Sequence, residues 1–371
     1  METVVEKVSQ DVCTGCGLCQ AICPHETLML HYNKDGFLVP IVCNDNCDGC
    51  NQCVEWCPTL RRPPVFKRYK DPKVYAAWSL DPEIRRNSTS GGIFSELAKQ
   101  IFKEDGWVSG AQYTSAHNVV HSVVYGMEGL LLLRQSKYVQ SKIDGVYQYI
   151  RWILQLTERK IAFCGTPCQV AALYNFVGDH PNLYTFDFIC RGANSYKAYE
   201  SYLQMLEKRY KSPISKVWFK NKTKGWNNFS TRVDFENGDY YIADRRTDLF
   251  MHGYIVRNLY MRPSCYNCQY RNLPHHSDIT LADFWGVKKG LDSDEGTSLV
   301  FINSTKGEKL FNKIKDYIYY EPSTVEAAIP GNSCIFKNPK KDPQSDLFLR
   351  LLDTMPFDKA LDTIKITPKK R

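Results

Sequence analysis

The sequence predicts a small α+β module rich in cysteine over residues 1–62, followed by a larger mixed α/β body that contains a βαβ unit. Three observations support this division. Of the 15 cysteines in 371 residues, nine lie between Cys13 and Cys57. Consecutive prolines at Pro63-Pro64 then interrupt regular structure. Beyond them, apolar residues recur at helix and strand spacing, in a chain that is 43% apolar and can bury a large core.

Two runs of cysteines in the module share the spacing C-x2-C-x2-C-x3-C-P. They are Cys13, Cys16, Cys19 and Cys23-Pro24, and Cys47, Cys50, Cys53 and Cys57-Pro58. This spacing is that of two-cluster ferredoxins, in which three thiolates bind one [4Fe-4S] cluster and the fourth reaches the other. We therefore expect cluster 1 on Cys13, Cys16, Cys19 and Cys57, and cluster 2 on Cys47, Cys50, Cys53 and Cys23.

Zinc is the alternative metal for such thiolates. It usually takes two C-x2-C pairs separated by a longer loop, whereas two complete runs that end in Cys-Pro favour iron and sulfide. Short strands of a ferredoxin-type repeat are expected at Leu28–His31 and Phe37–Val42. Cys43 has no place in the spacing and is expected to be a spare thiol.

The position of the charges bears on location and partners. Residues 1–60 hold eight acids and two bases, a net charge of −6, so with a total of +8 the rest of the chain carries +14. A cationic body suits acidic redox partners or phosphate-bearing cofactors, and no basic run interleaved with aromatics points to nucleic acid. The sequence has no apolar stretch long enough for a membrane span and does not start with the basic and then apolar residues of a signal peptide. The chain is therefore expected to be cytoplasmic, with no membrane span.

The first part of the body, residues 71–156, contains glycines and hydroxyls before a helix. Ser88-Thr89-Ser90-Gly91-Gly92 precedes apolar residues at helical spacing over Ile93–Phe102. Such a helix start offers free backbone N–H groups and a positive dipole end to a phosphate, as a flavin nucleotide presents. A plain N-cap on a loop explains the same residues equally well.

The second part, residues 157–330, contains the βαβ unit. A strand over Lys160–Cys164, a helix over Val170–Phe176 and a strand over Leu183–Cys190 are expected, and parallel strands end at one edge of the sheet. The four thiols that this arrangement and a further C-x2-C pair supply are Cys168, Cys190, Cys265 and Cys268. They suit a third [4Fe-4S] cluster, a structural zinc, or a redox dithiol at the last two alone. Cys164 and Cys334 are expected to be bystanders, and residues 331–371 to form a tail with short helices.

Five motifs in order resemble the beta-subunit family of coenzyme F420 hydrogenases and dehydrogenases, over roughly residues 75–320. The motifs are Ser88–Gly92, Ser136–Ser141, Gly165–Gln169, Cys265–Cys268 and Ala282–Gly286. The family includes related deazaflavin oxidoreductases and 7-hydroxymethyl chlorophyll a reductase, and a ferredoxin module in front is a common arrangement in it.

The resemblance implies an FAD flavoprotein body with its own [4Fe-4S] cluster, in which flavin exchanges hydride with an organic substrate and single electrons with iron-sulfur centres. It leaves the catalytic residues unassigned. Lys137 is expected to place a cation near the phosphates or near N1 of the flavin. The implied FAD contacts are Ser88, Thr89, Ser90, Gly91, Gly92, Ser136, Lys137, Tyr138, Gln140 and Ser141.

The expected function is an iron-sulfur flavoprotein oxidoreductase that passes electrons between ferredoxin-type clusters and a coenzyme F420-like or other organic substrate. Expected partners are a redox protein or small electron carrier, a hydride donor or acceptor, and a partner subunit or second copy. The alternative is a non-catalytic electron-transfer subunit, or an accessory of a surface-polysaccharide pathway. Where many members have Cys-His-Gly, this chain has Cys190-Arg191-Gly192. If that histidine takes part in proton handling in those members, the chemistry of this chain differs from theirs.

Overall fold

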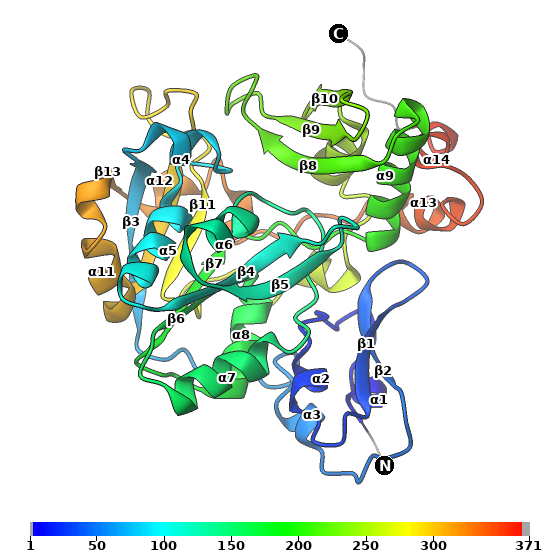
Figure 1. Cartoon of the computed structure of the whole chain (residues 1–371). Coiled ribbons are helices and arrows are strands. Elements are labelled where there is room, and N and C mark those ends of the chain that lie inside the picture. Colours follow the sequence, from blue (N-terminus) through cyan, green and yellow to red (C-terminus); the bar gives the residue numbers. More distant parts are fainter. Residues whose placement is uncertain (1–2, 366–371) are drawn as a thin grey trace.

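The N-terminal module, blue in Figure 1, is a hairpin with three short helices against it. The computed structural model describes residues 3–365. The hairpin pairs β1 (Leu28–Tyr32) antiparallel with β2 (Leu38–Val42), as the sequence predicts. The helices are α1 (Val4–Lys7), α2 (Leu18–Ile22) and α3 (Gln52–Glu55).

The duplication of the cysteine runs is visible in the backbone. Helices α2 and α3 begin from equivalent residues, Gly17 at φ 85° and Asn51 at φ 59°, each one position after the second cysteine of its run. Glycine and asparagine are the residues that adopt this left-handed conformation most readily.

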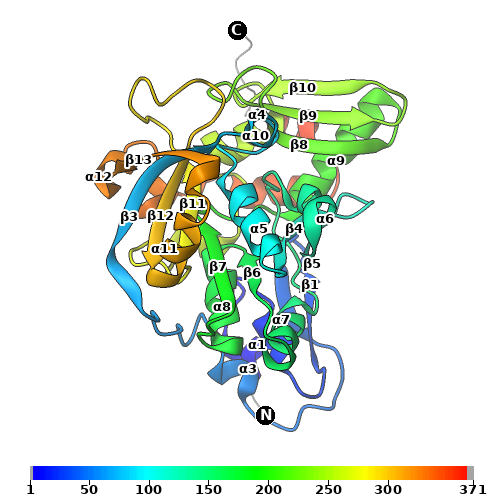
Figure 2. The same cartoon turned by 60° about the vertical axis from the view of Figure 1, so that its left-hand side comes forward.

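A mixed sheet of eight strands forms the centre of the body (Figures 1 and 2). Its order is β13-β3-β12-β11-β7-β6-β4-β5. The strands are β3 (Arg68–Ser79), β4 (Trp107–Tyr113), β5 (Val119–Val124), β6 (Ile161–Cys164), β7 (Leu183–Phe188), β11 (Ile279–Asp283), β12 (Ser298–Ser304) and β13 (Ile318–Ser323). The neighbours from β4 to β11 run parallel and the outer strands pair antiparallel. The predicted mixed α/β body is confirmed.

The predicted βαβ unit is also confirmed. Strand β6 leads into α8 (Pro167–Val177) and returns as β7, parallel to β6. A capping box starts α8, since Thr166 accepts from the backbone N–H of Gln169 while the Gln169 side chain accepts from the Thr166 N–H. The Gly165–Gln169 motif is thus a helix start that holds Cys168 in the first turn.

Helices cover both faces of the sheet. Alternate residues of β6 point to opposite sides: Ala162 packs with α5 (Ile93–Lys103) and α11 (Thr305–Asn312), whereas Ile161 and Phe163 pack with α7 (Val146–Leu156) and α8. The body is therefore a three-layer arrangement around the sheet.

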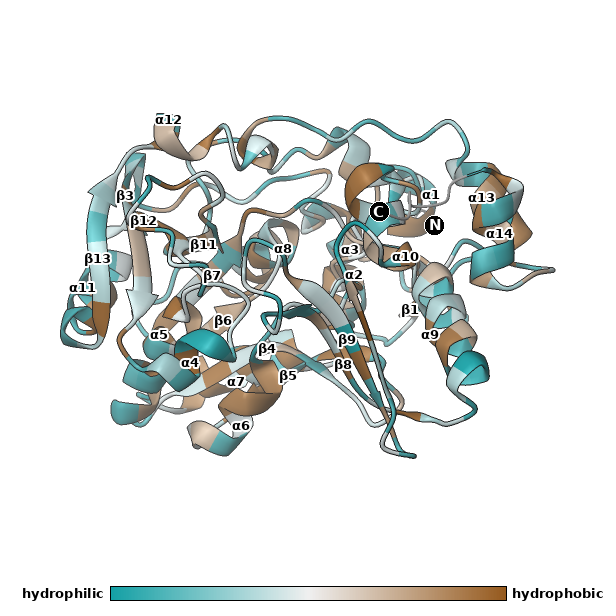
Figure 3. Ribbon diagram, turned by 90° about the horizontal axis from the view of Figure 1, so that it is seen from above, coloured by the Kyte–Doolittle hydropathy of each residue, from teal (hydrophilic) through white to brown (hydrophobic). Residues whose placement is uncertain are grey.

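A smaller antiparallel sheet lies beside the main one. It has the order β10-β9-β8 and consists of β8 (Ile214–Asn221), β9 (Ser230–Phe235) and β10 (Tyr240–Asp244), with a turn at Asn237-Gly238 between the last two. Its core is shared with α9 (Tyr196–Tyr210), α13 (Ser345–Leu351) and α14 (Phe357–Thr363). Figure 3 shows hydrophobic and hydrophilic residues on both tail helices, α13 and α14. The predicted tail reaches 371, and 366–371 lie outside the described residues.

The remaining elements are short. They are α4 (Pro82–Arg86), α6 (Gly126–Leu133), α10 (Leu249–Met251), α12 (Val325–Ala328), the π-helical η1 (His252–Val256) and the 3-10 turns η2 (Pro263–Asn267), η3 (Lys315–Tyr317) and η4 (Ser333–Ile335). Within the described chain, every helix is too short or too polar to span a bilayer.

The module packs closely on the body. Cys16 and Leu18, at the start of α2, belong to one apolar cluster with residues of α7 and α8. Strand β3 begins at Arg68, so residue 71, the expected start of the body, lies inside it.

Candidate functional site

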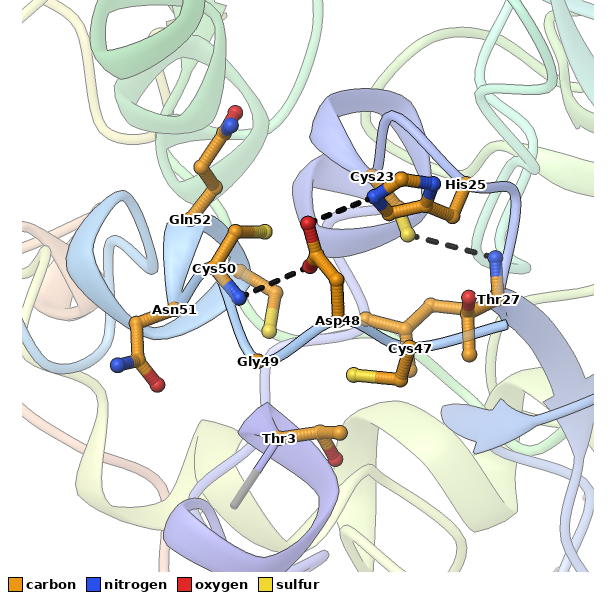
Figure 4. Close-up of a pocket in the computed structure, with 12 residues that line it drawn as sticks. Thr3, Cys23, His25, Thr27, Cys47, Asp48, Gly49, Cys50, Asn51 and Gln52 are labelled. Atoms are coloured by element: carbon orange, nitrogen blue, oxygen red, sulfur yellow. Dashed lines mark hydrogen bonds and ion pairs between the residues drawn. The ribbon is translucent and has the colours of Figure 1, made fainter. Parts of the chain in front are cut away.

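Four thiols at the outer end of the module line one pocket, shown in Figure 4. They are Cys23, Cys47, Cys50 and Cys53, the set expected to bind cluster 2. The backbone N–H of Thr27 donates to the Cys23 sulfur at 3.3 Å, and His25 pairs with Asp48 at 2.9 Å beside it. Because Cys50 is exposed, this group faces solvent.

The set expected to bind cluster 1 gathers on the inner side of the module. Burial raises the pKa of the Cys16 thiol, and the charges of Cys57 and Cys13 raise it further. Cys19 is half-buried and is coupled to Cys16, Cys13 and Cys57. The fourth cysteine of the second run thus lies with the first three of the first run, as expected for crossed ligands.

The third set lies on the body, at the edge where β6 and β7 end. Burial raises the pKa of Cys168 to about 12, and the charges of Cys268 and Cys265 add to the effect. Burial also raises the pKa of Cys190, with Cys265 as its strongest charged neighbour. Backbone N–H groups of Ala193 and Tyr270 donate to the sulfurs of Cys265 and Cys268, each at 3.4 Å.

The thiol set expected to bind cluster 1 and the thiol set on the body are neighbours. The Cys16 thiol is coupled electrostatically to Cys168, across the contact between α2 and α8. Between them, the Tyr147 hydroxyl donates to the carbonyl oxygens of Cys16 and Gln169, both at 3.1 Å. The inner thiol group of the module therefore lies beside the thiol group of the body.

Within residues 3–365, no three His, Cys, Asp or Glu side chains converge closely enough to hold a single metal ion. A cubane binds its four thiolates on four separate irons, so its ligands stand farther apart than those of one zinc ion.

The start of α5 has the properties expected of an anion site. Gly92 caps it at φ 89° without a side-chain hydrogen bond, and in the described chain the N–H groups of Gly92, Ile93 and Phe94 have no protein acceptor. A Cβ on Gly91 would lie 2.4 Å from the Ala77 carbonyl oxygen, so packing alone already requires that glycine. Glu96 is buried in the first turn and accepts from Ser79, which places a carboxylate near the same helix end.

Two lysines of β8 and the loop after it lie beside this helix start. The Lys222 ammonium donates to the carbonyl oxygens of Ser90, Arg85 and Glu295 at 2.6–2.7 Å, and burial lowers its pKa to about 7. Lys220 forms a buried ion pair with Asp283. Neither lysine was among the FAD contacts expected from the sequence.

Parts of three of the five sequence motifs, Ser88–Gly92, Ser136–Ser141 and Ala282–Gly286, are linked near this point. The Thr89 hydroxyl bonds to Ser136 at 3.0 Å, and Tyr138 is coupled to Lys220. Nε1 of Trp226 donates to Asp283 at 3.0 Å, and its ring stacks on Trp285 with centroids 4.3 Å apart. A signal for this pairing existed, because Asp283 and Trp285 belong to the Ala282–Gly286 motif.

The expected FAD contacts divide in the structure. Lys137 turns to the carbonyl oxygens of Arg134 and Leu132 at the end of α6, and burial lowers its pKa to about 7. Gln140 instead donates to Thr14 and Gly15 of the module.

The last expected contact, Ser141, bonds to the ring of His121 at 2.7 Å and accepts from Gln169 at 3.2 Å. Gln140 and Ser141 thus join module, sheet and α8, whereas Ser88–Gly92, Ser136 and Tyr138 gather around the start of α5. Arg191, at the position of the family's histidine, donates to Ile255 and Asn258, both at 2.7 Å.

Comparisons with known proteins match most of the chain. Residues 74–146 and 158–328 match the N-terminal and C-terminal parts of the coenzyme F420 hydrogenase/dehydrogenase beta subunit, and residues 12–60 match a 4Fe-4S dicluster domain. No curated protein matches. A solved structure described as a xenon derivative of the F420-reducing [NiFe] hydrogenase complex from Methanosarcina barkeri contains a similar chain. That chain is 22% identical, with 82% of this chain and 94% of that one covered and a TM-score of 0.46.

Two consecutive parts of one family thus account for residues 74–328 apart from a short gap, in the order in which the motifs occur. The dicluster match covers both cysteine runs. The chain is an iron-sulfur protein that belongs to the coenzyme F420 hydrogenase/dehydrogenase beta-subunit family.

Proposed function

We propose that this chain is an oxidoreductase that uses three [4Fe-4S] clusters and FAD. Single electrons pass between cluster 2, cluster 1 and a third cluster on Cys168, Cys190, Cys265 and Cys268. FAD bound at the start of α5 exchanges a hydride with an organic substrate. The flavin is needed because clusters carry one electron at a time and hydride donors carry two.

The observation that carries this proposal is the contact of α2 with α8, which brings the Cys16 group of the module beside the Cys168 group of the body. Four thiols without a metal would have no physical reason to gather beside the ligands of a dicluster module. N–H donors to the sulfurs of Cys23, Cys265 and Cys268 suit thiolates, which accept such bonds far better than thiols.

The start of α5 supports the flavin part of the proposal. Its free N–H groups suit a pyrophosphate, and Lys222 adds a cation that has only carbonyl partners. The stacked Trp226 and Trp285 add a flat aromatic face nearby. These residues would hold the phosphates and border the ring system.

The substrate class that fits is a deazaflavin such as coenzyme F420 or another organic hydride carrier. The proposed electron partner is a redox protein or small carrier that meets the exposed Cys50 group, and a partner subunit or second copy would complete the assembly. We propose a cytoplasmic setting, in which cysteine thiols stay reduced and so remain able to bind clusters.

The test is the metal and flavin content of anaerobically purified protein. Three cubanes predict about twelve irons per chain and one FAD, bleached by the reduced substrate. Eight irons with one zinc would assign the Cys168 group to zinc. Twelve irons without flavin would leave the chain an electron-transfer subunit.

A further inference from the structure

Arg262 lies between the thiol set expected to bind cluster 1 and the thiol set on the body. It is almost completely buried, with 1% of its surface exposed. Its guanidinium reaches from the body into the module. Nη1 donates to the Cys13 carbonyl oxygen at 2.9 Å, Nη2 to that of Leu38 at 2.5 Å, and Nε to the Gln140 side chain at 3.1 Å.

No carboxylate pairs with this cation among residues 3–365; all three acceptors are neutral oxygens. The ring of Phe37 covers it, 5.5 Å from the guanidinium carbon. A buried charge without a counter-charge is unfavourable, as when a buried ion pair loses one partner. A negative charge that the protein chain alone does not supply would offset that cost.

The backbone of Arg262 belongs to the third thiol group. Its N–H donates to Ala193 at 2.8 Å, and its carbonyl oxygen accepts from the Cys265 N–H at 2.9 Å. Although burial dominates and raises the pKa of both Cys168 and Cys265, the Arg262 charge acts in the opposite direction on each. The residue thus touches the Cys13 loop with its side chain and the Cys265 loop with its main chain.

The Arg262 guanidinium comes so close to the module that it restricts the residue type at position 15. A Cβ at Gly15, between Cys13 and Cys16, would lie 2.6 Å from the Arg262 Nη2. Gly15 also has φ +63°, where a side chain would be strained. The first cysteine run is therefore shaped to admit the guanidinium.

We propose that Arg262 is a positioning residue that serves as the shared counter-charge of the two inner clusters and raises the reduction potential of both. The inference rests on the proposed function, since it needs clusters on both thiol groups. Each reduction adds one electron, and so one negative charge, to a cluster, and the fixed cation stabilises that added charge.

Arg271 supplies a matched control. It is also buried, at 9% exposure, and donates to the carbonyl oxygens of Cys265 at 2.8 Å and Arg191 at 2.6 Å. Its hydrogen bonds all lie within the body. Removal of its charge should affect the third cluster alone, whereas removal of the Arg262 charge should affect both inner clusters.

The experiment measures the potentials of all clusters by dithionite titration of full-length, anaerobic protein, followed by electron paramagnetic resonance. Arg262→Gln should weaken the electron affinity of cluster 1 and the third cluster about tenfold, which is 59 mV for a one-electron couple. Cluster 2, at the far end of the module, should keep its potential. Arg262→Lys should stay near the wild type because it keeps the charge, and Arg271→Gln should shift the third cluster only.

Unchanged potentials in an iron-replete Arg262→Gln protein would overturn the inference and leave Arg262 a structural peg. If Arg262→Gln loses iron, the Arg262→Lys and Arg271→Gln variants decide. Lowered potentials of both inner clusters in Arg262→Lys would overturn the inference. Wild-type potentials in Arg262→Lys, together with a shift of the third cluster alone in Arg271→Gln, would support it. Fewer than twelve irons in the wild type would instead refute the proposed function, before any potential is compared.

Discussion

At the scale of the residue, Gly92 combines two roles that the sequence could not separate. Its φ of 89° suits glycine whatever binds at the helix, and a Cβ there would meet Ile84 at 3.0 Å. The N-cap and the phosphate interpretations therefore both require glycine. A test of the phosphate interpretation must therefore compare variants that have the same backbone strain at residue 92.

Asparagine and aspartate meet that condition, because they have the same shape and both tolerate the left-handed region. Gly92→Asn should keep most of its FAD. Gly92→Asp, which places a carboxylate among the free N–H groups, should weaken FAD binding by roughly tenfold or more, as about 1–2 kcal/mol of dipole and charge interaction is reversed. Flavin content after gel filtration measures both. Equal FAD in the two variants would leave α5 with a capping role only.

At the scale of the element, β8 and the turn after it hold the loop that precedes α5. Lys222 bonds to three carbonyl oxygens, which requires all three ammonium protons. Burial lowers its pKa to about 7, so it loses a proton near neutral pH.

Affinity for FAD should therefore fall as the pH rises. The pyrophosphate is anionic over this whole pH range, so its binding favours protonated Lys222. The affinity for FAD is therefore greatest below the pKa that Lys222 has in the protein without FAD. It declines roughly tenfold from about pH 6 to about pH 9. Flavin fluorescence titration of apoprotein measures this slope. Lys222→Met should flatten it, while Lys224→Met, at an exposed position of the same loop, should not. A slope that persists in Lys222→Met would assign the titration to another group.

At the scale of the whole molecule, module and body are joined by buried polar contacts and by a shared apolar cluster. The flavin candidate site and the Cys16 group nevertheless use different elements, since within residues 3–365 neither Lys222 nor Gly92 forms a hydrogen bond to the module.

Cys16→Ser should remove or convert cluster 1 and leave FAD bound. About eight irons should remain if cluster 1 is lost, and about eleven if it converts to a three-iron form, because the other two thiol sets keep all their ligands. Cys43→Ser is the control: this exposed thiol donates to the backbone oxygens of Glu26 and Thr27 at 3.2 Å, and its loss should leave twelve irons. Iron and flavin assays on anaerobic protein measure both, and loss of flavin from Cys16→Ser would show that the two sites depend on each other.

Sequence reasoning anticipated proximity where it follows from local spacing or from one topological rule. Spacing predicts that Cys57 lies with the first cysteine run, and the common edge of parallel strands predicts that Cys168 meets Cys190. The thiols do lie together in this way, and their binding of clusters stays a prediction. Sequence reasoning failed where partners lie far apart in the chain. Strand β3 pairs with β12 and β13 across more than two hundred residues, and no pattern near Lys220 or Arg262 announces Asp283 or Cys13 as its partner.

The placement of Cys16 has a consequence for biosynthesis. This thiol belongs both to a cysteine run and to the apolar cluster that joins α2 to α7 and α8. A scaffold protein that hands over iron and sulfide can reach it only while the module stands away from the body. We therefore expect maturation to have a fixed order. Iron and sulfide reach the Cys16 group first, and α2 then packs on α7 and α8, which shields the cluster from oxygen.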